Sequence, residues 1–365
     1  MASLSACSAA SPPSSSPSGG QAKAREPVVA EGTNQAGIVR PGSPQPQLVS
    51  LVFDLSDDMG NRAIANLLAA LGERILVLTE QPMLGVVSDQ DLTVTVGIGP
   101  RLVNAVDPNL PGAEALPRFR REDIDSEARG GDLWLQICGS DPLAVSLAEV
   151  SLRESLGGSA RLNWRQGAWR GDSGLVESSS TPKVRAPRNM LGFQDGITLP
   201  RGDKELDEGV WISEPDLLSG ATIAVVRRFR FNMTGWQALD VDQQQKAVGR
   251  ELVSSRPLSG GEEIDLGAKT PEGVYLVPID AHARRAHPLA LGVPVMLRRS
   301  YSIDDPYPGL LFISFQNTLR AFTATMASLD EADRMLDFTT TTASASFLVL
   351  PGFTRSKPLG SALYE

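Results

Sequence analysis

Histidine and cysteine, the residues that most often bind transition metals, are scarce in this chain of 365 residues. The sequence contains two histidines, His282 and His287, and two cysteines, Cys7 and Cys138. A structural zinc site needs four ligands of these types, and a disulfide-stabilised small domain needs several cysteine pairs. The inventory therefore excludes a disulfide framework and makes a zinc site hard to assemble.

Long apolar runs and an excess of positive charge are also missing. No stretch reaches the roughly 18 apolar residues that a membrane-spanning helix needs, so no such segment is expected. Lysine and arginine number 34 against 43 aspartates and glutamates, which gives a net charge of −9 at pH 7. Because nucleic-acid phosphates require a basic surface, this balance argues against a nucleic-acid partner.

The first 33 residues have the composition of a disordered leader. They are rich in Ser, Ala, Pro and Gly and cannot bury enough apolar surface to fold. The segment lacks a twin-arginine motif and an apolar h-region, although Leu4 to Cys7 resembles the end of a lipoprotein-type signal. The protein is therefore expected to be secreted or held in the cell envelope if an export signal is missing upstream of Met1, and otherwise cytoplasmic.

Hydrophobic periodicity predicts two successive units in the rest of the chain. The first has strands at 48–55, 92–98, 132–138 and 162–169 and helices at 57–71 and 142–156, with Asp57 or Asp58 as the first helix cap. After a loop-rich connection, the second has strands at 221–231, 274–277, 295–301, 310–315 and 344–350 and helices at 240–252 and 317–329.

The order of these elements predicts an α+β fold. The first unit follows the β-α-β-β-α-β order of ferredoxin-like folds, and the second follows a similar order. We therefore expect two ferredoxin-like halves, each an antiparallel β-sheet with helices. The expected boundaries are a leader at 1–33, an N-terminal domain at 34–205 and a C-terminal domain at 206–365.

One carboxylate in the long connection has an unusual setting. Asp195 lies between Gly192 and Gly196 in a mostly apolar segment, NMLGFQDGITLP, that runs from Asn189 to Pro200. The glycines permit a tight turn and a close approach of the backbone to a flat or bulky group. A long loop in a compact enzyme is often functional, but the spacing alone is equally compatible with a turn and a solvated carboxylate.

Together with five other segments, this stretch resembles the dye-decolourising peroxidase family of haem proteins. The other segments are NQAGI at 34–38, IDAHARRAHP at 279–288, VMLRRSYS at 295–302, GLLFISFQ at 309–316 and LDFT at 336–339. The resemblance covers about 34–351 and implies a haem b cofactor, bound in the C-terminal half of a two-part ferredoxin-like fold. A haem is compatible with the scarcity of histidine, because its iron needs one protein ligand.

The resemblance assigns residues to the proximal side of the haem. His282 falls on the family pattern Ala-His-x-Arg and is the expected axial ligand of the iron, whereas His287 lies outside the motif. The second ring nitrogen of such a ligand donates to a carboxylate, for which Asp337 is the expected partner and Asp333 the alternative. Arg250 matches a basic position that can pair with a haem propionate, or is an ordinary arginine near a helix C-terminus.

The resemblance also assigns the distal side. Asp195 matches the carboxylate that moves a proton of the peroxide, directly or through one water. Arg298 matches the arginine that stabilises charge on the departing oxygen. Because successive strand residues point to opposite faces, Arg298 and Arg299 cannot both face the haem, and Arg299 takes the role if the register differs by one. Three further residues complete the expected distal pocket: Ser300, Leu310 and Phe312.

The implied function is a haem peroxidase that reduces hydrogen peroxide and oxidises small aromatic donors such as phenols and dyes through a ferryl intermediate. Aromatic residues either relay electrons from bulky donors or pack in the core: Trp211, Trp236, Tyr301 and Tyr307. One rival is a haem-binding or haem-iron handling protein with little peroxidase turnover, which needs His282 but not the distal pair. Another is a non-catalytic ferredoxin-like module that binds no haem. The sequence does not predict an oligomeric state.

Overall fold

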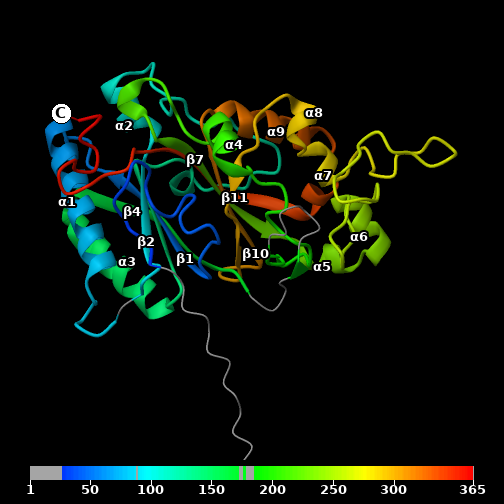
Figure 1. The fold of residues 1–365 in the computed structure, drawn as a ribbon, viewed down its shortest axis with the longest axis horizontal. Coiled ribbons are helices and arrows are strands. Elements are labelled where there is room, and N and C mark those ends of the chain that lie inside the picture. Colours follow the sequence, from blue (N-terminus) through cyan, green and yellow to red (C-terminus); the bar gives the residue numbers. More distant parts are fainter. Residues whose placement is uncertain (1–26, 88, 172–175, 178–184, 365) are drawn as a thin grey trace, which may run out of the picture.

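A computed structural model gives the fold of the protein and describes residues 27–87, 89–171, 176–177 and 185–364 (Figure 1). Most of the predicted leader, including Cys7 and the stretch that resembles a lipoprotein signal, lies outside the described residues. No helix in the described ranges combines the length and the apolar character needed to cross a membrane.

The centre of the molecule is a nine-stranded antiparallel sheet in the described part of the chain. Its strands are β1 (Gln47–Leu55), β2 (Thr93–Ile98), β3 (Leu133–Gly139), β4 (Ala160–Trp169), β7 (Thr222–Phe231), β8 (Leu297–Arg298), β9 (Tyr301–Ile303), β10 (Gly309–Gln316) and β11 (Thr339–Val349). Their order is β7-β11-β2-β3-β1-β4-β9-β10-β8, and β10 also pairs with β7, which closes the sheet into a barrel. Two short strands, β5 (Val176–Glu177) and β6 (Arg185–Ala186), pair separately.

Side chains alternate between the inside and the outside of this barrel. On β10, Leu311, Ile313 and Phe315 are fully buried and join the apolar cluster that fills the barrel. Leu310 and Phe312, on the opposite face of the same strand, line a cavity outside the barrel. This alternation is the period of two that a strand imposes, and it separates a packed core from a ligand-sized space.

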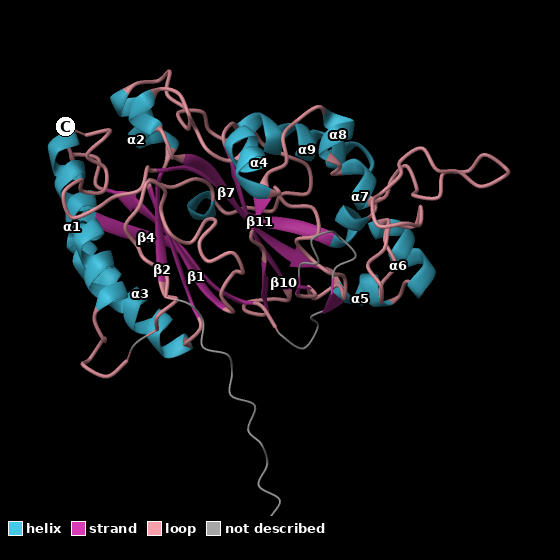
Figure 2. Cartoon of the chain, viewed as in Figure 1, coloured by secondary structure: helices cyan, strands magenta, loops and turns pink. Residues whose placement is uncertain are grey.

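Helices cover the outer faces of the barrel (Figures 1 and 2). Beside the first strands lie α1 (Asn61–Glu80), α2 (Pro100–Val106) and α3 (Pro142–Leu156), and beside the later ones lie α4 (Gly202–Gly209), α5 (Met233–Gln237), α6 (Val241–Val248), α7 (His282–Arg285), α8 (Pro288–Leu291) and α9 (Leu319–Ala332). The loop between α6 and α7 projects from the right of the molecule in Figure 1.

The mixed helix and strand content is confirmed, but the halves do not form separate sheets. Strands of the first half lie side by side in the order β4-β1-β3-β2. Strands of the second half lie in the order β11-β7-β10-β9. In both halves, leaving aside the short β8, the fourth strand along the chain is followed by the first, the third and the second. Because β2 pairs with β11 and β4 pairs with β9, the two sets join into one continuous sheet.

Some predicted elements differ from those observed. Helix α1 begins after Gly60 rather than at Asp57 or Asp58, and it continues to Glu80 because its apolar face extends through Ile75, Leu76 and Leu78. The predicted strand at 274–277 is wrong, since these residues lie in the projecting loop, where Val274 is 65% exposed. The predicted helix at 240–252 stops at Val248 because Gly249 adopts a left-handed conformation with φ of 88°.

Candidate active site

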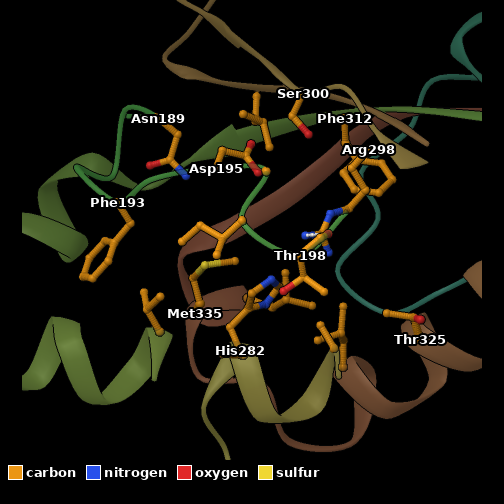
Figure 3. Close-up of a pocket in the computed structure, with 18 of the residues that line it drawn as sticks. Asn189, Phe193, Asp195, Thr198, His282, Arg298, Ser300, Phe312, Thr325 and Met335 are labelled. Atoms are coloured by element: carbon orange, nitrogen blue, oxygen red, sulfur yellow. Dashed lines mark hydrogen bonds between the residues drawn. The ribbon is translucent and has the colours of Figure 1, made fainter. Parts of the chain in front are cut away.

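A cavity of about 190 Å³ lies outside the barrel, against β7, β10 and the segment that carries Asp195, with α7 and α9 on the other side (Figure 3). Most of its wall is apolar. The lining includes Leu191, Phe193, Phe229, Phe231, Met296, Leu310, Phe312, Phe322, Met326, Leu329 and Met335. A space with this lining fits a largely apolar ligand that makes few polar contacts.

His282 reaches the cavity from α7 and is held by a buried carboxylate. Its Nδ1 lies 2.6 Å from Oδ2 of Asp333, and Asp333 is 1% exposed. The other oxygen, Oδ1, accepts a hydrogen bond from the Leu336 amide at 2.9 Å. A carboxylate is chiefly an acceptor, so this contact favours the tautomer in which Nδ1 donates to Asp333 and Nε2 is left for a ligand in the cavity.

The prediction that Asp337 is the partner of His282 is wrong. Asp337 is exposed, and its carboxylate pairs with Arg121 at 2.6 Å. Helix α9 ends at Ala332, so Asp333 is the first residue beyond it and lies under α7. A short 3-10 turn, Met335–Phe338, then carries Asp337 away from the cavity to the surface.

Asp195 lines the cavity on the side opposite His282 (Figure 3). Its amide donates to the Pro187 carbonyl at 3.0 Å, and the Asn189 amide donates to the Phe193 carbonyl at 2.9 Å, so the segment folds back on itself. Gly192 has φ of 90°, a conformation that glycine adopts without strain. The predicted tight turn therefore exists, and it presents the carboxylate to the cavity.

The two consecutive arginines face opposite ways. Arg298 lines the cavity on the same side as Asp195, and its Nη2 donates to the Thr198 carbonyl at 3.0 Å (Figure 3). Burial lowers the pKa of Arg298, and the nearby Asp195 carboxylate acts against that shift. Arg299 is 2% exposed and donates to the Pro41 carbonyl, away from the cavity. The strand register thus places Arg298 at the cavity.

The other predicted residues also line the cavity. Ser300, Leu310 and Phe312 do so, and the shared face of Leu310 and Phe312 agrees with the alternation along their strand. Arg250 lies there too and donates to the Ser255 carbonyl at 3.0 Å, while burial, with a smaller effect of Arg298, lowers its pKa to about 10.

His287 lines the cavity as well, and burial together with Arg250 lowers its pKa. Among the described lining residues, Asp195 is the single acidic side chain beside the two arginines and two histidines. This wall therefore favours a ligand that carries negative charge.

Sequence reasoning missed the contribution of α9 to the cavity. Four of its residues line the space at helical spacing: Phe322, Thr325, Met326 and Leu329. The helix itself was predicted at 317–329, and the i, i+3, i+4, i+7 pattern is visible in the sequence. Such a stripe indicates core packing as readily as a ligand wall, so periodicity alone does not identify it.

Comparison with known proteins agrees with this geometry. Residues 35–170 match the family profile described as "Dyp-type peroxidase, N-terminal", and residues 186–354 match "Dyp-type peroxidase, C-terminal". The chain is 32% identical over 295 residues to a dye-decolorizing peroxidase of Thermobifida fusca, covering 75% of this chain and 67% of that protein. It is 26% identical over 372 residues to a deferrochelatase of Escherichia coli K12, covering 91% and 86% respectively.

Solved structures show the same similarity. A DyP-type peroxidase from Cellulomonas bogoriensis superposes with a TM-score of 0.83 at 31% identity, covering 93% of this chain and 98% of that one. Ferric DtpA from Streptomyces lividans superposes with a TM-score of 0.83 at 29% identity, with the same coverage of 93% and 98%.

Proposed function

Because this chain belongs to the dye-decolourising peroxidase family and is a haem peroxidase of that type, we propose that it reduces hydrogen peroxide and takes electrons from small aromatic donors such as phenols and dyes. One observation carries the proposal. The imidazole of His282, held by Asp333, faces the cavity from one side, and Asp195 and Arg298 face it from the other.

The residues of the cavity fit the haem of this family. The His282 Nε2 is the free ring nitrogen, because Nδ1 is engaged by Asp333, so Nε2 is the atom that would hold the iron. Apolar side chains would contact the porphyrin faces, and Arg250 is the group that would hold a propionate. When bound, the haem supplies an iron that activates peroxide and passes oxidising equivalents to donors.

The distal residues have separate roles in this proposal. A carboxylate oxygen of Asp195 takes a proton from the peroxide and returns it to the departing oxygen. The guanidinium of Arg298 stabilises the negative charge that develops on that oxygen. A smaller cavity of about 10 Å³ adjoins Asp195 and Ser300. That is about the space of one water, which would let water assist the proton transfer.

Stopped-flow mixing with peroxide tests these roles. We expect Arg298→Leu to slow the first spectral change by about 10²–10³, and Asp195→Asn to slow it by about 10²–10⁴, with haem retained in both. Arg299→Leu is the matched control, because Arg299 points away from the cavity, and it should react at the wild-type rate. Wild-type rates in both distal variants would overturn the proposed mechanism.

A second candidate function is the handling of haem iron with little peroxidase turnover. It is favoured by the alignment with the deferrochelatase, which spans 91% of this chain. This function needs His282 to hold the haem but does not need Asp195 or Arg298. Release of iron and metal-free porphyrin from the haem-loaded protein, equally fast in wild type and Arg298→Leu, would favour it over the peroxidase.

The division of the chain into two units and its cellular location are also proposals. The corresponding strand orders support two ferredoxin-like units with a boundary at 205/206. Many lining residues lie between 229 and 339, which supports a haem held mainly by the C-terminal half.

Export is tested by the DNA upstream of Met1: an in-frame stop codon next to Met1, with no basic and apolar segment between, would favour a cytoplasmic protein.

A further inference from the structure

One arginine outside the predicted site connects two segments that form the cavity. Arg188 Nη1 donates to the carbonyls of Gly192 at 2.7 Å and Leu252 at 2.5 Å, and its Nη2 donates to the Val253 carbonyl at 2.8 Å. Gly192 precedes Asp195 by three residues, and Leu252 follows Arg250 by two. We propose that Arg188 is a positioning residue that fixes the carboxylate of Asp195 over the cavity.

The local backbone explains why a side chain is needed there. Arg188 lies between Pro187, whose carbonyl accepts from the Asp195 amide, and Asn189, whose amide donates to the Phe193 carbonyl. These main-chain bonds close the loop at its base, but the Gly192 carbonyl lies at the loop's turn. A charged guanidinium bonded to carbonyls is a strong donor, and its fork can serve several acceptors at once. Arg188 therefore fixes the Gly192 carbonyl at the turn, as hydrogen bonds between strands fix carbonyls in a sheet.

The two bridged segments also touch. A Cβ on Gly192 would lie 3.3 Å from Leu252 Cδ1, so the Leu252 side chain packs against Gly192 where Arg188 joins the two segments. Arg188 and Asp195 both line the small cavity of about 10 Å³. Loss of Arg188 would free the turn from the 252–253 segment. A displacement of about 1 Å at a reacting group can lower a rate by about 10².

This inference rests on the proposed role of Asp195, and a double-mutant cycle separates the two. We expect Arg188→Met to slow the reaction with peroxide by about 10- to 100-fold when Asp195 is present. In an Asp195→Asn background, the same substitution should change the rate by less than about twofold. A merely structural role for Arg188 would slow both backgrounds alike.

A second readout does not depend on activity. In haem-free protein, hydrogen exchange at the amides of Asn189 and Asp195 should be faster in Arg188→Met than in wild type. Arg188→Lys should be intermediate in both measurements, because an ammonium keeps the charge but cannot reproduce the planar fork. This variant also serves as the test if Arg188→Met does not fold.

Arg40→Met provides a matched control. Arg40 also donates to three main-chain carbonyls, those of Val29, Glu31 and Asn34, but lies outside the cavity lining. It should lose stability while keeping the wild-type rate with peroxide.

The outcomes of the cycle separate the inference from the function on which it rests. A slow Asp195→Asn with a wild-type rate in Arg188→Met would overturn the inference, as would additive effects of the two substitutions. A wild-type rate in Asp195→Asn would instead overturn the function proposed for Asp195.

Discussion

The carboxylate that orients His282 is decided by where one helix ends. Asp333 and Asp337 lie in the same short stretch, and the sequence favours Asp337 with Asp333 as the alternative. The resemblance located the stretch, but neither it nor periodicity fixes the side on which each residue lies after α9 ends. The change to a 3-10 turn sends Asp333 inward and Asp337 outward. The sequence therefore predicts which segments form the candidate site. It predicts less well which side chains within those segments contact one another.

Replacing the two aspartates tests this assignment. Asp333→Asn removes the carboxylate that accepts from His282 Nδ1, and we expect peroxidase turnover to fall by about 10- to 100-fold. Asp337→Asn removes an exposed ion pair and should stay close to wild type. Turnover per bound haem, with one phenolic donor, is the measurement. Equal losses in the two variants would contradict the observed pairing.

Replacing the two histidines tests the proposed ligation. We expect His282→Ala to lose most of its haem, because the described cavity offers one other imidazole, that of His287. Burial and Arg250 lower the pKa of His287, and its buried Nδ1 has no hydrogen-bond partner among the described residues. Haem occupancy and the Soret band are measured after addition of haem to each variant. Full occupancy in His282→Ala with loss in His287→Ala would reverse the assignment.

Helices α6 and α7 meet at a glycine, which makes their contact testable. Gly249 has φ of 88°, and a Cβ there would lie 3.2 Å from the side chains of Ala281 and Ala283, which flank His282. We expect Gly249→Ala to destabilise the fold by about 1–2 kcal/mol through its backbone alone. It should also weaken haem binding, because the added methyl group presses on α7.

Gly260→Ala is the control for this prediction. Gly260 has φ of 79° with nothing within 4 Å of its Cβ position, so the substitution imposes the same backbone strain without the contact. Urea unfolding and haem titration of both variants are the measurements. Equal haem affinity in the two would show that the contact between α6 and α7 does not position His282.

Elements with a long, regular pattern were predicted best. Helix α3 has the predicted bounds at 142–156, because Asp141 caps it before Pro142 and Gly157 ends it. The predicted strand at 295–301 is instead split into β8 and β9, and the one at 274–277 does not form. Short segments of this kind adopt a strand only when a partner pairs with them, and sequence periodicity does not report the partner.

At the scale of the whole molecule, closure of the sheet predicts that the two halves unfold together. Fluorescence of Trp134 and Trp164 in the first half and of Trp236 in the second should report one coincident transition in urea. Separately produced halves, 34–205 and 206–365, should aggregate, because β2 and β4 lose their partners β11 and β9 and become open edges. Two separated transitions would contradict this expectation.

The acid response of the haem-free protein should depend on His287. Its pKa is lowered in the folded state, so the unfolded state binds its proton more readily, and stability falls as the pH drops below about 6.5. We expect His287→Gln to lose less stability than wild type between about pH 7 and about pH 5. Urea unfolding at the two pH values measures the free energy of unfolding of each protein. The same loss between the two pH values in wild type and in His287→Gln would contradict the prediction.

The similar strand orders of the two halves affect which mutations the fold can tolerate during evolution. In the first half, the helix layer of α1 and α3 closes over the sheet with aliphatic side chains such as Leu71, Ile75 and Leu152. In the second half, side chains of α7 and α9 on one side and of β7 and β10 on the other line the cavity. One continuous sheet joins the two halves. Mutations that reshape the cavity therefore change a fold that the first half also stabilises. Because the two halves are expected to unfold together, stability gained by packing in the first half can offset stability lost at the cavity.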